Sequence, residues 1–146
     1  MPGVTNPAEA FFKDGNWGWD GTVWRKLPMV WGYSEHYAER KLNLNAAAGT
    51  NVLNGSVVPA GEVWVLEICG AFDVNTAPSR MIFTVTDGVT FAPFYRDDTP
   101  VVYVTSSWTG RIALTEGCYV QVVFFDCVLN DDLYVDLWGY KMKVAE

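Results

Sequence analysis

The chain has 146 residues, half of them hydrophobic, with a net charge of −7 and a pI near 4.6. This length and apolar content suit one packed domain with an attached arm, and they exclude a wholly disordered chain. The acidic balance disfavours nucleic acid and anionic membranes as partners, because both carry charge of the same sign. No apolar run approaches the roughly 20 residues that cross a bilayer.

Residues 1–40 are rich in glycine, proline and aromatic residues and show no sustained alternation. We interpret them as an N-terminal arm of turns and short extended pieces, followed by a domain at 41–146. Short helical turns are expected at 6–15 and at 34–40, where Ser34 precedes acidic residues. The first residues lack the basic and apolar segments of a secretory signal, so we expect synthesis in a cytoplasm.

The arm carries four of the seven tryptophans of the chain: Trp17, Trp19, Trp24 and Trp31. Tryptophan is large and mostly apolar, so a soluble protein seldom leaves several of them without a surface to cover. Aromatic residues are also enriched among the anchors of protein interfaces. We therefore predict that these four residues anchor the arm on another protein or on the following domain.

From about residue 50 the pattern is strand-like. Alternation of apolar and polar residues predicts strands over 62–74, 79–88, 118–127 and 133–144, and the dipeptide at 87–88 predicts a tight hairpin. A further strand is expected at 100–105, beginning at Pro100. About eight strands at this spacing predict an all-β fold, an antiparallel β-sandwich of jelly-roll type. An immunoglobulin-type Greek key is the alternative, but its Cys…Trp…Cys spacing is absent.

The alternation also assigns side chains to faces. In the strand at 62–74 one face is expected to carry Trp64, Leu66, Ile68 and Phe72, and the opposite face Val63, Val65, Glu67, Cys69 and Asp73. In the last strand the inward residues are expected to be Leu133, Val135 and Leu137, and the outward ones Tyr134, Asp136 and Trp138. Together with Tyr140, these outward aromatic residues indicate a second surface that a partner covers.

Catalysis has little support in the sequence. His36 is the only histidine and lies in a charged stretch, and no nucleophile elbow or activated-cysteine signature accompanies it. The acidic pairs at 97–98 and 131–132 fall at expected turns, where aspartate caps backbone amides. A glycosidase pair among them cannot be recognised from sequence, because the separation of the carboxylates is not readable. We expect no enzyme activity and no cofactor.

Two parts of the sequence contain residue types that bind metals. Asp14, Asn16 and Asp20 resemble the start of a calcium loop, but Gly18 and Arg25 stand where further ligands belong. Cys69, Cys118 and Cys127 are odd in number and widely spaced, which argues against a zinc site and a disulfide framework. Cys118 and Cys127 are too far apart on one strand to bond, whereas a pairing of Cys69 with either stays open. Free thiols and no metal are expected.

Sugar binding is the main alternative to protein contact. β-Sandwich sugar binders stack pyranose rings on exposed aromatic side chains, and this chain has 7 Trp and 7 Tyr. Trp108 in "TSSWTG" is expected at a loop tip, where it is the candidate glycan contact.

Several stretches together resemble a known group of proteins. They are "WDGTVWRKLPMVWGYSEHYAE" (19–39), "VPAGEVWVLEICGAFDV" (58–74), "LTEGCYVQVVFFDC" (114–127) and "LYVDLWGYKM" (133–142). They are similar to small structural proteins of tailed bacteriophages, namely capsid decoration (cement) proteins and tail-attached jelly-roll modules.

The resemblance implies a non-enzymatic virion structural protein, made in the host cytoplasm and carried on the capsid surface. It implies a homotrimer whose arm contacts neighbouring copies and the major capsid protein, with no nucleic-acid or membrane partner. The alternative within the same group is a tail or receptor-binding module that recognises a host surface glycan.

Overall fold

The computed structural model describes residues 17–19, 24–26 and 35–144, and every regular element in these ranges is a β-strand. Two short strands come first, β1 (Trp17–Trp19) and β2 (Trp24–Lys26). The remaining strands are β3 (Glu35–Ala46), β4 (Gly49–Asn54), β5 (Glu62–Asp73), β6 (Arg80–Thr86), β7 (Phe91–Asp97), β8 (Ser106–Leu114), β9 (Tyr119–Cys127) and β10 (Asp131–Lys143).

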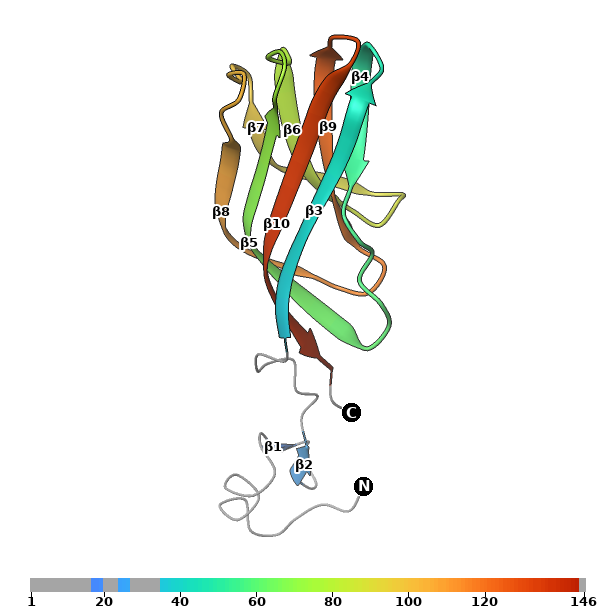
Figure 1. The fold of residues 1–146 in the computed structure, drawn as a ribbon. Helices are drawn as coiled ribbons and strands as arrows, with labels where there is room; N and C mark the ends of the chain where they lie inside the picture. The colour runs from blue at the N-terminus through green and yellow to red at the C-terminus, as the bar shows by residue number, and fades with distance from the viewer. Residues whose placement is uncertain (1–16, 20–23, 27–34, 145–146) are drawn as a thin grey trace.

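The eight strands from β3 onward form two antiparallel four-stranded sheets, in the orders β3-β10-β5-β8 and β4-β9-β6-β7 (Figure 1). The pairs are nested: β3 joins β10, β4 joins β9, β5 joins β8 and β6 joins β7. The chain thus forms one long hairpin that is folded over into two layers. At the centre of each sheet, β10 pairs with β5 in one layer and β9 pairs with β6 in the other. This is the strand order of a jelly roll, which confirms the predicted fold class.

The core lies between the two sheets. Its fully buried members include Leu66, Met81, Phe83, Val122, Phe124, Leu133, Val135 and Leu137. The prediction for β10 is confirmed, because its odd-numbered apolar residues are buried while Tyr134 and Asp136 are partly and Trp138 largely exposed. Burial of such side chains contributes about 1.5–3 kcal/mol each, so this interior supplies the main stabilising term.

The predicted inward and outward faces of β5 are correct at Trp64 and Leu66 but wrong for the residues after Glu67. The register against both neighbouring strands shifts next to Glu67, as it does at a β-bulge. Trp64 and Leu66 point into the core as expected, but Ile68 is exposed and Cys69 takes the buried position instead. One inserted residue turns every later side chain to the opposite face, which alternation alone does not reveal.

Two further expectations fail in the described region. Residues 35–40 are not helical but form the first half of β3, so the expected boundary between arm and domain at residue 40 falls inside a strand. Residues 100–105 are a loop rather than a strand. In this loop the amide of Tyr103 donates to the carbonyl of Asp73 (2.8 Å), and Tyr103 has a φ of 62°, which interrupts extended backbone.

Strands β1 and β2 pair with each other as an antiparallel hairpin. This hairpin is a short extended piece of the kind expected for residues 1–40. Within the described ranges, no helix has the length and apolarity needed to cross a membrane.

Candidate interaction surfaces

The first candidate surface is the solvent side of the β3-β10-β5-β8 sheet, called here the outer face. Trp138 on β10 is 48% exposed and pairs with Ala38 of β3 and Ile68 of β5, which is also exposed. The His36 ring meets the Trp138 ring edge-on, with 5.5 Å between the ring centres. The strand pairing therefore presents a large aromatic ring to solvent at the centre of a sheet rather than at a flexible tip.

Beside Trp138 the outer face becomes charged. The Arg40 guanidinium donates two hydrogen bonds to Asp136, at 2.6 and 2.8 Å. It also lies over the ring of Tyr134, which stacks on Phe72 with 4.9 Å between ring centres. A shallow depression of about 230 Å³ lies among Ala38, Glu39, Arg40, Asp136 and Trp138. An apolar ring thus adjoins a hydrogen-bond donor and a carboxylate acceptor, and ligand sites commonly combine aromatic surface with a few such polar groups.

Trp108 does not occupy the place expected for it. It lies within β8, opposite Cys69 of β5, and its half-buried ring meets Phe94 edge-on at 4.9 Å. The ring also lies across Gly110, where a Cβ would stand 2.5 Å from it, so the glycine leaves room for the indole. Trp108 therefore packs against the core instead of standing at a loop tip, and Trp138 is the more exposed tryptophan.

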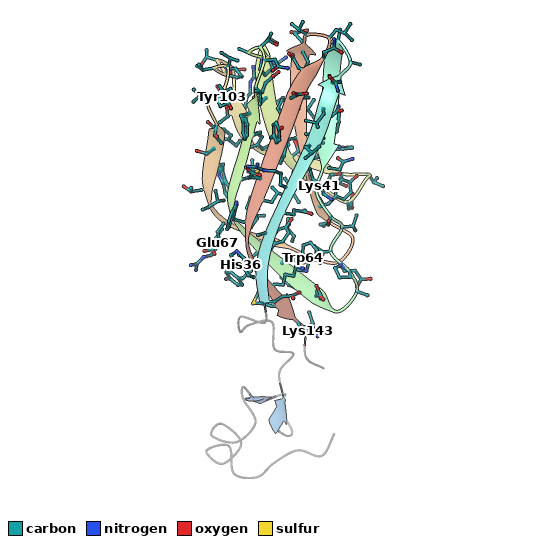
Figure 2. All side chains as sticks on the ribbon, viewed as in Figure 1. His36, Lys41, Trp64, Glu67, Tyr103 and Lys143 are labelled. Carbon is teal, nitrogen blue, oxygen red and sulfur yellow. The ribbon has the colours of Figure 1, made fainter. Side chains whose placement is uncertain are left out.

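The second candidate surface is the end of the sandwich at which the β3–β4, β5–β6, β7–β8 and β9–β10 connections meet, called here the apex (top of Figure 1). Its exposed apolar residues are Val101, Val102, Tyr103, Val104, Val128 and Leu129. Tyr103 is 72% exposed and marks this end in Figure 2. Because exposed apolar residues gathered at one end of a domain usually mark contact, the apex is a candidate interface.

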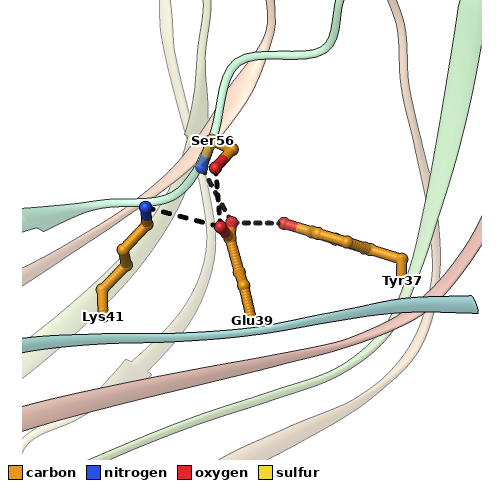
Figure 3. Close-up of polar contacts among 4 residues, drawn as sticks. All are labelled: Tyr37, Glu39, Lys41 and Ser56. Atoms are coloured by element: carbon orange, nitrogen blue, oxygen red, sulfur yellow. Dashed lines mark hydrogen bonds and ion pairs between the residues drawn. The ribbon is translucent and has the colours of Figure 1, made fainter.

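A half-buried carboxylate holds the edge of the sandwich together (Figure 3). Glu39 accepts hydrogen bonds from the Tyr37 hydroxyl (2.8 Å) and from the amide (2.8 Å) and hydroxyl (2.7 Å) of Ser56, and Lys41 lies 3.5 Å away. Burial acts to raise the pKa of Glu39, but these hydrogen bonds outweigh it and hold the pKa below its usual value. Burial, with the bond to Glu39, raises the pKa of Tyr37 far above its usual range. Near neutral pH Glu39 is therefore ionised and Tyr37 is neutral, which fits a structural role.

Beneath the apex lies a buried acidic cluster: Asp73 at the end of β5, Cys127 at the end of β9 and Asp131 at the start of β10. One potential ligand atom from each residue lies within 4.8 Å of the others. Burial, opposed by two backbone hydrogen bonds and assisted by Asp131, raises the pKa of Asp73 to about 6. All three cysteines of the chain are free thiols, and Cys69 and Cys127 are buried.

The predicted anchors fall largely outside what the structure describes. Trp17 and Trp19 belong to β1 and Trp24 to β2, with their backbones alone described, and Trp31 lies outside the described residues. The calcium-loop candidates Asp14, Asn16 and Asp20 also lie outside them. Sequence reasoning placed Trp138 correctly on the solvent side. The sequence does not predict the apex, because the valine-rich segment at 100–105 has the pattern of a strand but forms a loop.

Comparisons with known proteins add little to this picture. No protein-family model matches the chain, and no curated protein matches it. Among solved structures, a chain described as "CBM4 structure and function" is similar over 74% of this chain and 81% of that chain, with 14% sequence identity and a TM-score of 0.28. The fold assignment therefore rests on the strand order itself.

Proposed function

We propose that this chain is a non-catalytic structural protein of a tailed-phage particle, a capsid decoration protein that binds the major capsid protein and its own copies. The observation that carries the proposal is the exposed apolar apex. Exposed apolar surface on a soluble protein often marks a site that a partner covers, and six exposed apolar residues lie in two connections at this end of the sandwich. The sequence resemblance to phage structural proteins supplies the identity of that partner.

The carboxylates offer a substrate little access. Asp73 and Asp131 form an acidic pair whose potential ligand atoms lie within 4.8 Å of each other, and both side chains are sealed from solvent, at 0% and 1% exposure. A pair that a glycoside cannot reach does not provide general acid and base catalysis. This pair therefore does not support a hydrolytic role.

The first experiment is immunogold electron microscopy of phage particles with antibody against this chain. Gold spread over the head supports the decoration role, whereas particles without gold overturn the virion assignment.

Reconstitution onto particles stripped of the protein then tests the apex. Replacing Tyr103 and Leu129 together with serine should reduce binding about tenfold or more, because apolar anchors dominate such interfaces. The matched control is Val89→Ser, an exposed apolar residue in the β6–β7 hairpin, away from the apex connections.

A second candidate function is recognition of a host glycan through the outer face. It is favoured by Trp138, whose exposed ring lies beside the Arg40–Asp136 pair in a shallow depression. A pyranose stacked on the indole would place hydroxyl groups near a planar donor and a carboxylate. Glycan-array binding that Trp138→Ala abolishes and Ile68→Ala preserves would support this function. A silent array, with gold confined to the head, would reject it.

A further inference from the structure

The buried cluster of Asp73, Asp131 and Cys127 joins the two layers of the sandwich. β5 and β10 belong to one sheet and β9 to the other, and the three strands bring their ends together beneath the apex. All three side chains are buried. The cluster is therefore closed to bulk solvent and contains two acidic groups and one thiol that no disulfide engages.

The hydrogen bonding of the cluster is incomplete. Oδ1 of Asp73 accepts the amides of Asn75 (3.0 Å) and Thr76 (3.3 Å), whereas Oδ2 is buried and accepts no hydrogen bond from an amide or a hydroxyl group; the Asp131 carboxyl lies close enough to share a proton with Asp73. Asp131 accepts the Val128 amide and the Thr76 hydroxyl on its Oδ2, each at 2.6 Å. A buried acceptor without a donor is costly, and native structures usually satisfy it with a partner.

The cluster also lacks a positive charge. Among the described residues, no lysine, arginine or histidine forms an ion pair with Asp73 or Asp131. Buried carboxylates in proteins are paired with a cation, bound to a metal ion or neutralised by a proton. Glu39 has a lysine beside it and donors on both oxygens, whereas the cluster has no ion-paired cation and Asp73 has donors on one oxygen only, so a metal ion or a proton is needed to balance its charge.

We propose that Asp73, Asp131 and Cys127 form a binding site for a divalent ion of the zinc class. Zn²⁺ binds carboxylate oxygen and thiolate sulfur together, whereas Ca²⁺ and Mg²⁺ select oxygen ligands alone. The unpartnered Oδ2 of Asp73 supplies one ligand atom, and the Cys127 thiol becomes a ligand by losing its proton as the metal binds. The ion would tie β5 and β10 to β9 and so fix the connections that form the apex.

The test uses the full chain, stripped with a chelator and kept reduced. Zn²⁺ alone should bind at one ion per chain and raise the midpoint of thermal unfolding by about 5 °C or more, because a ligand of the folded state stabilises it by mass action. Co²⁺ should give a thiolate-to-cobalt charge-transfer band, which reports the sulfur ligand directly. Ca²⁺ should do neither.

Variants separate this site from metal bound elsewhere. Cys127→Ser should remove the cobalt band. Cys127→Ser and Asp131→Asn should each weaken Zn²⁺ binding about tenfold or more. Cys118→Ser is the matched control, because that thiol lies outside the cluster, and it should bind like the parent. Each variant is compared with its own metal-free form, so a general loss of stability does not imitate loss of the site.

Three results would overturn the proposal. They are the absence of Zn²⁺ binding, stabilisation by Ca²⁺ in place of Zn²⁺, and a cobalt band that survives Cys127→Ser. In the first case the two carboxyl groups share a proton instead of a metal ion. None of these outcomes depends on whether the chain belongs to a phage particle.

Discussion

Glu39 and Asp73 are both carboxylates at the ends or edges of the sandwich, yet their surroundings are opposite. Both Glu39 oxygens receive hydrogen bonds and a lysine lies nearby, whereas one Asp73 oxygen has no partner. The pKa of Glu39 is accordingly lowered, while that of Asp73 is raised to about 6. Burial alone does not decide the charge of a carboxyl group, because the donors around it also count. A carboxylate whose oxygens all accept hydrogen bonds stabilises the fold, whereas a buried carboxylate with an oxygen that lacks a donor favours binding of a proton or a cation.

The largest expected effect on stability comes from deleting the part of β3 that carries Glu39. Deleting residues 1–34 should leave a folded sandwich, because all eight strands of the two sheets begin at Glu35 or later. Deleting residues 1–40 should unfold it, since the deletion removes half of β3 together with Tyr37 and Glu39. Circular dichroism during heating distinguishes the two proteins. Equal stability of both would show that the first half of β3 contributes nothing.

Replacing Glu39 alone should cost less. Glu39→Ala leaves the Tyr37 hydroxyl and two Ser56 donors without their acceptor, so we expect a loss of about 3 kcal/mol in the free energy of unfolding. Glu39→Gln keeps the shape and should lose about 1 kcal/mol. Urea denaturation measures both, with Glu116→Ala in an exposed turn as the control. A loss from Glu39→Ala no larger than that of the control would contradict the structural role.

The pH dependence of stability should have opposite signs for the two carboxyl groups in metal-free protein. For Glu39 the folded pKa lies below the usual 4.5, so its contribution is present above that pH and is lost as the pH falls through the folded value. For Asp73 the folded pKa is raised from 3.8 to about 6, so stability falls as the pH rises across that interval. Asp73→Asn should flatten the second slope alone, as measured by denaturation at a series of pH values.

The smallest effect is expected at the outer face. The Arg40–Asp136 hydrogen bonds are as short as those of Glu39, but the arginine is exposed and water competes for it. Arg40→Gln should therefore shift the midpoint of urea denaturation by less than Glu39→Gln does. Raising the salt concentration should shrink even this difference. A shift as large as that of Glu39→Ala would mean that exposure does not separate the two kinds of carboxylate contact.

Local patterns predicted the architecture well. Alternation gave the strands and identified the buried side of β10, because period-two patterning is a property of neighbouring residues. It failed where a single inserted residue reversed the faces of β5 at Glu67. It also failed at 100–105, where the Asp73 carbonyl, distant in sequence, binds the Tyr103 amide and holds a valine-rich segment in a loop.

The surfaces and the buried cluster were harder to foresee. Trp138 could be placed outward from its own strand, but Arg40 reaches Asp136 from 96 positions away. The spacing of Cys127 from the other cysteines argues against zinc, because it predicts no second thiolate ligand nearby. Its acidic neighbours come from β5 and β10, so only the rolled topology brings them to the thiol.

The nested strand pairs also determine the order in which this domain is completed. β10 lies between β3 and β5, so the last strand of the domain to be synthesised is the one on which two earlier strands depend. Contacts between such distant segments close long loops, which makes folding slow, in the range of milliseconds to seconds. Until β10 arrives, β3 and β5 expose unpaired edges that other chains can join. High concentrations of nascent chains should therefore favour aggregation, and a chain that ends before Asp131 should not fold.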